Sequence, residues 1–337
     1  MKRNERQGEE LPREQIKLFL QANQLIDSAK SELDVYQYFN GFSNLTYLLE
    51  IEDQAFVLRK PPTGAIKRGH DMGREFKVLS SLHKAFPKAP QALAFADAGT
   101  VTEASFYIME RVEGIILTTK EALSRNIPPA SFKTIANSWM DTFVELHQVD
   151  YKAIGLEDLG KPEGYIDRQV TNWGKQYLKA ATREIPEAHK VMEWMQNNQP
   201  KTYDYSLIHN DYKYDNIVFA DDNWQDVSAV LDWEMCTLGD PLMDLGTSIA
   251  YWSMATDGEM ILKGFPSPTA LEGNPGRHEL VEMYASKSGR PVDNLVFYYV
   301  YGLFKISVIV QQIFYRYQKG LTTDKRFAKL DEATVLF

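Results

Sequence analysis

The chain has 337 residues, of which 44% are hydrophobic and 25% are charged, a composition typical of globular proteins. At about 100 to 200 residues per domain, this length predicts two domains or lobes. The 46 acidic residues outnumber the 37 basic ones and give a net charge of −9. That charge argues against duplex nucleic acid as a partner, because such binding relies on Lys and Arg side chains that neutralise phosphates.

The cysteine content and the polarity of the chain point to a cytoplasmic protein. Cys236 is the single cysteine, so an internal disulfide is impossible, and we interpret it as a small core residue. The polar N-terminus lacks the apolar core of a signal peptide. The most apolar segment, 295–310, contains Lys305 and is shorter than the roughly 20 residues of a spanning helix, so we predict a core helix and no membrane span.

The first third of the chain has the pattern of a small β-rich unit. Residues 1–30 predict a polar extension followed by a helix. Segment 36–62 alternates, is rich in aromatic and branched residues, and contains turn signals at GFSN and EDQ, which predicts three strands joined by turns. Apolar residues at helical spacing in 73–86 predict a helix, and 104–114 reads as a short strand.

Beyond Gly114 the pattern becomes mainly helical. Two apolar runs around an Asp-Asp-Asn turn interrupt it with a predicted hairpin between Leu207 and Asp232. The clearest amphipathic segments are 132–150, 168–181 and 187–198. The whole pattern predicts an α+β, bilobal fold, with a small β-rich N-terminal lobe carrying an antiparallel sheet over 1–112 and a larger helical C-terminal lobe over 113–337.

The strongest chemical signal is His209-x-Asp211-x-x-x-x-Asn216, followed after the hairpin by Asp232. A loop aspartate can take a proton from an attacking hydroxyl, and an Asn and an Asp can hold a divalent metal through oxygen. Hard oxygen ligands suit magnesium. The alternative interpretation is a set of Asp and Asn residues that cap a turn.

The amino-acid sequences of these segments also resemble those of a known family. LIHNDYKYDNIVF followed by AVLDWEMCTLGDPLMDLG resembles the aminoglycoside phosphotransferase-like family, small-molecule relatives of the protein kinases. FNGFSNLTYLLE, FVLRKPP, GREFKVLSSL, FYIMERVEG and PEGYIDRQVTNW resemble the branch of that family associated with acyl-CoA dehydrogenases. The resemblance covers 36–252 and implies a kinase-like fold with ATP and Mg²⁺ as cofactors.

Carried over by position, the resemblance assigns the reacting groups of the second lobe. It implies that Asp211 is the catalytic base and that Asn216 and Asp232 are the magnesium ligands. His209 becomes a structural residue of the catalytic loop. The buried aspartate that supports this loop is expected at Asp244, with Asp240 as the competing candidate.

The resemblance also implies a nucleotide-binding set in the first lobe. The loop around Gly41, Ser43 and Asn44 would cover the ATP phosphates with its backbone amides. The adenine would contact the backbone of a hinge formed by Met109, Glu110 and Val112.

A phosphate-binding cation is expected on the strand FVLRK. Side chains alternate across a strand, so only one of Arg59 and Lys60 can point into the site. We favour Arg59, which shares its face with Val57, and expect Glu75 as its partner. The alternative is a plain surface ion pair.

The acceptor site is less defined by the sequence. Arg168 and Trp173, in YIDRQVTNW, are candidate acceptor-site residues, with a helix that packs through Trp173 as the alternative. The tyrosines of YWSMA and VFYYVYGLF are interpreted as core residues, some of which could line an acceptor pocket.

The predicted function is transfer of the γ-phosphate of ATP to a hydroxyl of a small molecule. The branch resemblance favours a hydroxyacyl-CoA-type metabolite as acceptor. The alternatives are an aminoglycoside or amino-alcohol kinase, a non-catalytic nucleotide-binding module, a protein kinase and a structural protein. The sequence leaves the oligomeric state open.

Overall fold

The computed structural model describes residues 2–38, 44–62, 71–322, 327–328, 330 and 334. Contacts along the chain divide it into two compact units, which are described separately. The first unit comprises Met1–Glu113, Lys152–Leu156 and Ser228–Met235. The second unit comprises Gly114–Tyr151, Glu157–Val227 and Cys236–Phe337. The chain therefore leaves the first unit near Gly114 and returns to it for two short segments.

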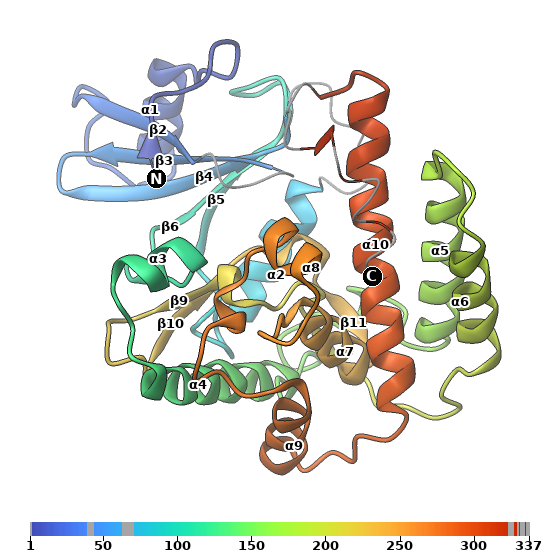
Figure 1. Ribbon diagram of the computed structural model, residues 1–337. Coiled ribbons are helices and arrows are strands. Elements are labelled where there is room, and N and C mark those ends of the chain that lie inside the picture. Colours follow the sequence, from blue (N-terminus) through green and yellow to red (C-terminus); the bar gives the residue numbers. More distant parts are fainter. Residues whose placement is uncertain are drawn as a thin grey trace. The chain divides into compact units, whose positions relative to one another are not determined.

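The first unit is built on an antiparallel sheet. Among the described residues the sheet has six strands in the order β1-β2-β3-β4-β6-β5 (Figure 1). The strands are β1 (Lys2–Arg3), β2 (Leu33–Tyr38), β3 (Leu45–Ile51), β4 (Gln54–Lys60), β5 (Ala92–Ala96) and β6 (Phe106–Glu110). The three strands predicted in 36–62 are confirmed, although β2 begins earlier, at Leu33, and most of the predicted GFSN turn lies outside the described residues.

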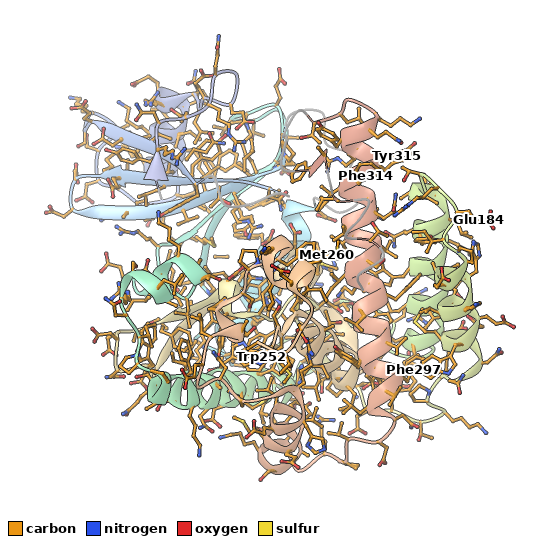
Figure 2. All side chains as sticks on the ribbon, in the orientation of Figure 1. Glu184, Trp252, Met260, Phe297, Phe314 and Tyr315 are labelled. Atoms are coloured by element: carbon orange, nitrogen blue, oxygen red, sulfur yellow. The ribbon has the colours of Figure 1, made fainter. Side chains whose placement is uncertain are left out.

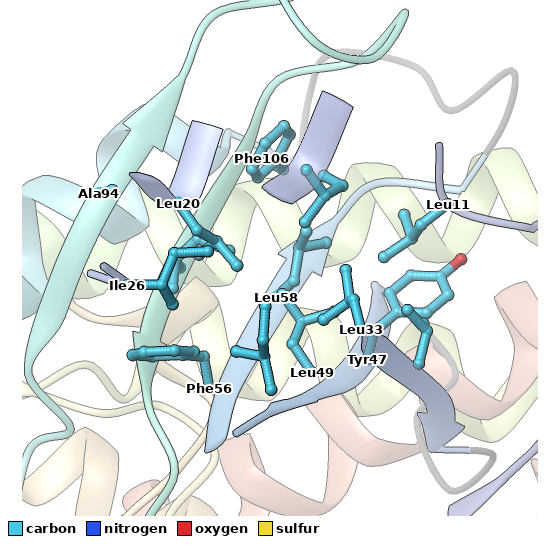
Figure 3. Packing of buried hydrophobic residues seen from close by; sticks show 14 of the residues in the cluster. Leu11, Leu20, Ile26, Leu33, Tyr47, Leu49, Phe56, Leu58, Ala94 and Phe106 are labelled. Carbon is cyan, nitrogen blue, oxygen red and sulfur yellow. The ribbon is translucent and has the colours of Figure 1, made fainter. Parts of the chain in front are cut away.

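One face of this sheet forms an apolar core with helix α1 (Arg13–Ala22). Figure 3 shows Leu20 of α1 close to strand residues that include Leu49 and Leu58. Because side chains alternate along β4, Leu58 points into this core and Arg59 points to the opposite face. Helix α2 (Met72–Leu82) packs against β5 and β6 and carries the partner of Arg59.

The second unit is mainly helical. Its helices are α3 (Thr119–Ser124), α4 (Pro129–His147), α5 (Tyr165–Ala180), α6 (Pro186–Asn197), α7 (Pro241–Tyr251), α8 (Glu259–Gly264), α9 (Arg277–Ser288) and α10 (Leu295–Gln318). Helix α10 packs along α7, and the α5–α6 pair lies beside it (Figure 1). In Figure 2, Phe297 lies near one end of α10 and Tyr315 near the other.

Helix α10 is the segment predicted as a core helix from its apolar sequence. It extends beyond Val310 to Gln318, and its length and hydropathy would allow it to cross a membrane. However, 61% of its most apolar window is buried inside the structure. A core helix of a folded unit has this property, as the sequence predicts.

Short strands frame the segment that carries the HNDYKYDN motif. Strand β8 (Ser206–Ile208) pairs antiparallel with β11 (Thr237–Gly239), and β9 (Ile217–Phe219) pairs with β7 (Ile115–Ile116). The motif loop runs from the end of β8 to the start of β9, and a 3₁₀ turn, η1 (Tyr214–Asn216), closes it. The chain enters β10 (Val227–Val230) as it returns to the first unit.

Candidate functional site

The motif loop is held by a buried carboxylate. Asp244, on α7, accepts hydrogen bonds from the backbone N–H of His209 at 2.6 Å and of Asn210 at 2.7 Å. These contacts suit the supporting aspartate that the sequence placed at either Asp244 or Asp240. Asp240 instead caps α7, where its Oδ1 accepts from Leu242 N at 2.8 Å.

Asp244 remains ionised although it is buried. Burial raises its pKa, but the hydrogen bonds from His147 and from the His209 backbone outweigh burial and lower the pKa below its usual range. His147 is fully buried, and burial lowers its own pKa, so its ring is neutral. Its Nε2 lies 3.2 Å from Asp244, and its Nδ1 lies 2.8 Å from the Tyr284 hydroxyl. This chain of contacts fixes the carboxylate beneath the loop.

Asp211 lies at the centre of a polar cluster. Lys213 Nζ contacts both of its carboxylate oxygens, at 3.0 and 2.9 Å. Asn216 donates to the Asp211 backbone carbonyl and to its Oδ2, each at 2.9 Å. Tyr251 hydrogen bonds to the same carboxylate, and burial raises the pKa of Tyr251, so its phenol stays protonated. The structure thus brings together the proposed base and the proposed amide ligand, with Lys213, which sequence reasoning did not assign, and Tyr251, the tyrosine of YWSMA that it interpreted as a core residue or part of an acceptor pocket.

The Asn216 side chain uses only its amide nitrogen to contact Asp211. Because its amide nitrogen directs two hydrogen bonds at Asp211, its Oδ1 oxygen points away from that residue. A neutral amide oxygen is a ligand that suits magnesium. In the described part of the chain, no group of three or more His, Cys, Asp or Glu forms a metal cluster.

A cavity of about 410 Å³ opens next to this cluster, entirely within the second unit. Lys213, Asp215 and Tyr251 line it on the side of the motif loop. Much of the remaining wall is apolar, and one side of α10 contributes Leu303, Ile306, Ile309, Val310 and Ile313. Aromatic side chains complete it: Trp139, Tyr214, Trp252 (labelled in Figure 2), Phe265 and Tyr299.

The polar groups of the cavity wall are largely paired. Arg277 forms a two-point ion pair with Asp257, at 2.9 and 2.5 Å, and its Nε donates to the Trp252 carbonyl at 2.9 Å. Lys213 is paired with Asp211. The wall therefore presents a mixture of apolar, aromatic and charge-neutralised groups rather than a ring of carboxylates.

The two residues that the sequence offered as acceptor contacts do not line this cavity. Arg168 donates to the backbone carbonyls of Lys161 and Glu163 and so holds the loop that precedes α5. Trp173 is buried, with its ring 5.9 Å from Lys305 Nζ. The burial of Trp173 corresponds to the packing alternative that the sequence left open, whereas Arg168 is engaged by backbone carbonyls.

The first unit contains a second charged cluster, centred on Arg59. Its guanidinium contacts Glu75 at 3.2 Å, Asp232 at 3.0 Å and Glu234 at 3.7 Å. Arg59 and Glu75 are both buried, and burial raises the pKa of Glu75 while Arg59 limits the increase. The alternation of β4 puts Lys60 on the other face. The structure thus joins Arg59, Glu75 and Asp232, while Asp232 and Asn216 belong to different units.

The remaining residues proposed for the nucleotide are spread over the first unit. Gly41 and Ser43 lie outside the described residues. Asn44 donates to Glu234 at 2.9 Å and so joins the Arg59 cluster. Met109 and Glu110 end strand β6, where the Glu110 N–H donates to the Gln91 carbonyl at 3.0 Å. That amide is therefore already engaged, and Val112 follows beyond the strand.

His209 and Cys236 are both fully buried. The Nδ1 of His209 accepts from the Asp211 N–H at 3.3 Å, which is a structural contact within the loop. Cys236 is a free buried thiol, in keeping with its interpretation as a small core residue.

Comparison with known proteins identifies related chains. Mouse acyl-CoA dehydrogenase family member 10 is 32% identical over 89% of this chain, and chicken acyl-CoA dehydrogenase family member 11 is 34% identical over 88%. This chain spans only 28% and 39% of the lengths of those proteins. The similarity therefore concerns one part of each relative.

Solved structures share the fold. A crystal structure described as a putative aminoglycoside phosphotransferase from Ralstonia eutropha is 30% identical, with a TM-score of 0.80 and coverage of 97% of this chain and 96% of that chain. At lower identity, 15% and 14%, the fold matches a streptomycin–ATP–APH(2″)-IIa ternary complex and a Cryptosporidium parvum choline kinase. The TM-score is 0.58 for both. The alignments cover 95% of this chain, and 96% and 99% of those chains.

These neighbours confirm the predicted kinase-like α+β fold. The model of one family, described as the phosphotransferase enzyme family, matches residues 36–266. This chain therefore belongs to the phosphotransferase enzyme family.

Proposed function

We propose that this protein transfers the γ-phosphoryl group of ATP to a hydroxyl group of a small molecule. The observation that carries the proposal is the placement of Asp211 beside the 410 Å³ cavity. Its carboxylate is fixed by Asn216, and Lys213 and Tyr251, which contact it, line the cavity wall. Family membership and the ATP-bound neighbour of the same fold support the choice of nucleotide.

The residues of the motif loop have defined tasks in this proposal. Asp211 orients the acceptor hydroxyl and accepts its proton as the oxygen bonds to the γ-phosphorus. The bond from that phosphorus to the bridging oxygen breaks, and ADP leaves. Asn216 and Asp232 are assigned to magnesium because their side chains offer hard oxygen donors. The ion, when bound, supplies positive charge that neutralises the phosphate oxygens.

Arg59 is assigned to the nucleotide phosphates. Its guanidinium is buried and held by Glu75, and the fork geometry of an arginine matches that of a phosphate group. Positioning and charge neutralisation, rather than covalent chemistry, would account for most of the rate enhancement.

The cavity wall favours an acceptor with an extended apolar part. Leu303, Ile306, Val310 and Ile313 recur along α10 every three or four residues and form one continuous apolar stripe. A polycationic aminoglycoside would need more unpaired carboxylates than Asp215 and Asp257 offer, since Asp257 is already bound to Arg277. We therefore place a hydroxyacyl-CoA-type metabolite first, in line with the similarity to parts of acyl-CoA dehydrogenase family members.

An amino alcohol is the second candidate acceptor. The aromatic residues of the wall could contact a quaternary ammonium group through their ring faces. A positively charged acceptor would rely on Asp215 for its neutralisation, since Asp257 on the same wall is already paired with Arg277.

A direct assay separates these candidates. ATP consumption would be measured with hydroxyacyl-CoA esters of increasing chain length, with amino alcohols and with aminoglycosides. The Asp211→Ala protein serves as the blank, and Asp293→Asn serves as the control because Asp293 is exposed in the same unit. We expect turnover with hydroxyacyl-CoA esters that increases with chain length. Turnover with choline alone would favour the second candidate, and no acceptor-dependent turnover above the blank would overturn the proposed activity.

A further inference from the structure

A buried lysine lies behind the motif loop. Lys305, in the middle of α10, is 1% exposed, and its Nζ donates to the backbone carbonyl of Asn210 at 2.6 Å. Its Nζ also lies 5.9 Å from the centre of the Trp173 ring. No carboxylate among the described residues forms an ion pair with it. A buried ammonium without a counterion is costly to fold, so this lysine calls for an explanation beyond packing.

The pKa of Lys305 reflects the cost of burying its charge. Burial lowers its pKa to about 8, while Asp244 and Asp211 oppose that shift and Lys213 adds to it. Asp244 is on α7, and the other two charged groups are on the motif loop. The ammonium is therefore held mainly by the Asn210 carbonyl and by the more distant carboxylates.

The residue that Lys305 contacts has an unusual backbone. Asn210 has a φ of +67°, in the left-handed region that non-glycine residues seldom occupy. Three contacts from three helices stabilise this conformation. Asp244 binds its N–H at 2.7 Å, Lys305 binds its carbonyl, and the Tyr165 hydroxyl donates to its Oδ1 at 3.3 Å.

The same carbonyl belongs to the peptide that joins Asn210 to Asp211. The N–H of that peptide donates to His209 Nδ1 at 3.3 Å, while its oxygen is held by Lys305. Because a peptide unit is planar, fixing both its oxygen and its N–H fixes the direction in which the next residue leaves. The next residue is Asp211.

We infer that Lys305 is a positioning residue for Asp211: its ammonium locks the Asn210–Asp211 peptide and thereby aims the Asp211 carboxylate. This inference rests on the proposed role of Asp211 as the base. Lys305 does not touch the acceptor in this scheme, since it is absent from the cavity wall.

The test compares two buried polar residues of α10. Lys305→Met removes the donor to Asn210. The matched control is Gln311→Met, because Gln311 is 2% exposed and donates to another backbone carbonyl, that of Ala180, at 2.9 Å. For Lys305→Met we expect kcat to fall by about 10 to 100-fold with KM for ATP within about twofold, the effect of a small misplacement of a reacting group. Gln311→Met should lose a similar amount of Tm and keep kcat within about twofold.

A second variant guards against misfolding. Lys305→Gln keeps a donor one bond shorter and removes the charge, so it should retain a larger part of kcat than Lys305→Met. Equal kcat losses in Lys305→Met and Gln311→Met, or wild-type kcat in both Lys305 variants, would show that Lys305 is only a core residue.

Amide hydrogen exchange separates this inference from the proposed function. In the protein without acceptor, exchange at Asn210 and Asp211 should accelerate about tenfold or more in Lys305→Met and stay unchanged in Gln311→Met. If the wild type phosphorylates no acceptor but this exchange pattern is observed, the proposed activity is wrong and the locking of the peptide by Lys305 is supported. Unchanged amide exchange at Asn210 and Asp211 in Lys305→Met would show that Lys305 does not lock the peptide.

Discussion

The backbones of α7 and α10 touch at Gly246 and Gly302. A Cβ atom on Gly302 would lie 2.4 Å from the Gly246 carbonyl oxygen, and one on Gly246 would lie 2.2 Å from the Tyr298 carbonyl oxygen. Asp244 lies two residues before the first glycine, and Lys305 lies three residues after the second. The close approach thus sets the separation of α7 and α10. Asp244 of α7 binds the backbone N–H of Asn210, and Lys305 of α10 binds its carbonyl.

Gly302→Ala tests this crossing. The added methyl group meets backbone atoms that cannot rotate away, so the free energy of unfolding should fall by about 1 to 3 kcal/mol despite the better helix propensity of alanine. Gly174→Ala, in α5, is the control, since its Cβ would meet only the flexible end of Met192 at 3.3 Å. Urea unfolding should show a loss for Gly302→Ala and no loss for Gly174→Ala. Equal stability of the two variants would contradict the close packing.

Asp211→Ala removes the proposed base. We expect kcat to fall by about 10² to 10⁴-fold, the range for a lost general base. The variant should bind ATP with an affinity close to that of the wild type, because the nucleotide contacts are assigned to other residues. Steady-state kinetics with a proven acceptor and an ATP titration measure both quantities. A fully active Asp211→Ala protein would mean that another group takes the proton.

Arg59 and Glu75 form a buried ion pair whose contributions to stability and to ATP binding can be measured separately. Arg59→Met leaves the Glu75 carboxylate buried and unpaired, so stability should fall by about 3 to 5 kcal/mol. Adding Glu75→Met should restore most of that stability. Both proteins should bind ATP at least about tenfold more weakly than the wild type, as measured by calorimetry.

The control for the Arg59→Met and Arg59→Met/Glu75→Met variants is Arg111→Met. Arg111 is a more exposed arginine of the same unit, with ion-pair distances of 3.8 Å to Glu50 and 3.5 Å to Glu113. Surface pairs of this kind contribute at most about 1 kcal/mol. If the double variant Arg59→Met/Glu75→Met binds ATP as the wild type does, the pair is structural and the phosphate contact lies elsewhere.

Local sequence pattern was sufficient for much of the first unit. The alternation of β4 predicted that Arg59 and Lys60 point to opposite faces, and the structure pairs Arg59 with Glu75 of the following helix. The short spacing within HNDYKYDN likewise fits the contact between Asp211 and Asn216, five residues apart on one loop. Such contacts follow from the geometry of one strand or one loop.

Long-range contacts could not be predicted in this way. Lys305 looked like a single interruption of an apolar core helix, and nothing in the periodicity of α10 indicates a carbonyl partner 95 residues earlier in the chain. The left-handed φ of Asn210 has only the weak signal that asparagine tolerates it. Arg277, which meets Asp257 at the cavity wall, had no sequence signal, because its role depends on how α9 packs.

Asp240 predicts how stability depends on pH. Its carboxylate is buried, caps α7 and accepts from the Tyr298 hydroxyl at 2.8 Å, and burial raises its pKa to about 6. An unfolded aspartate titrates near 3.9. Between these values the folded state binds more protons than the unfolded state, so the free energy of unfolding falls as pH rises through this window.

Asp240→Asn removes the titration. Relative to that variant, the wild type should therefore lose about 2 kcal/mol between about pH 4.5 and about pH 7.5 in urea unfolding. Asp293→Asn, at an exposed site, is measured beside it as the control variant. A constant gap between the wild type and Asp240→Asn across this range would mean that Asp240 keeps an ordinary pKa in the folded protein.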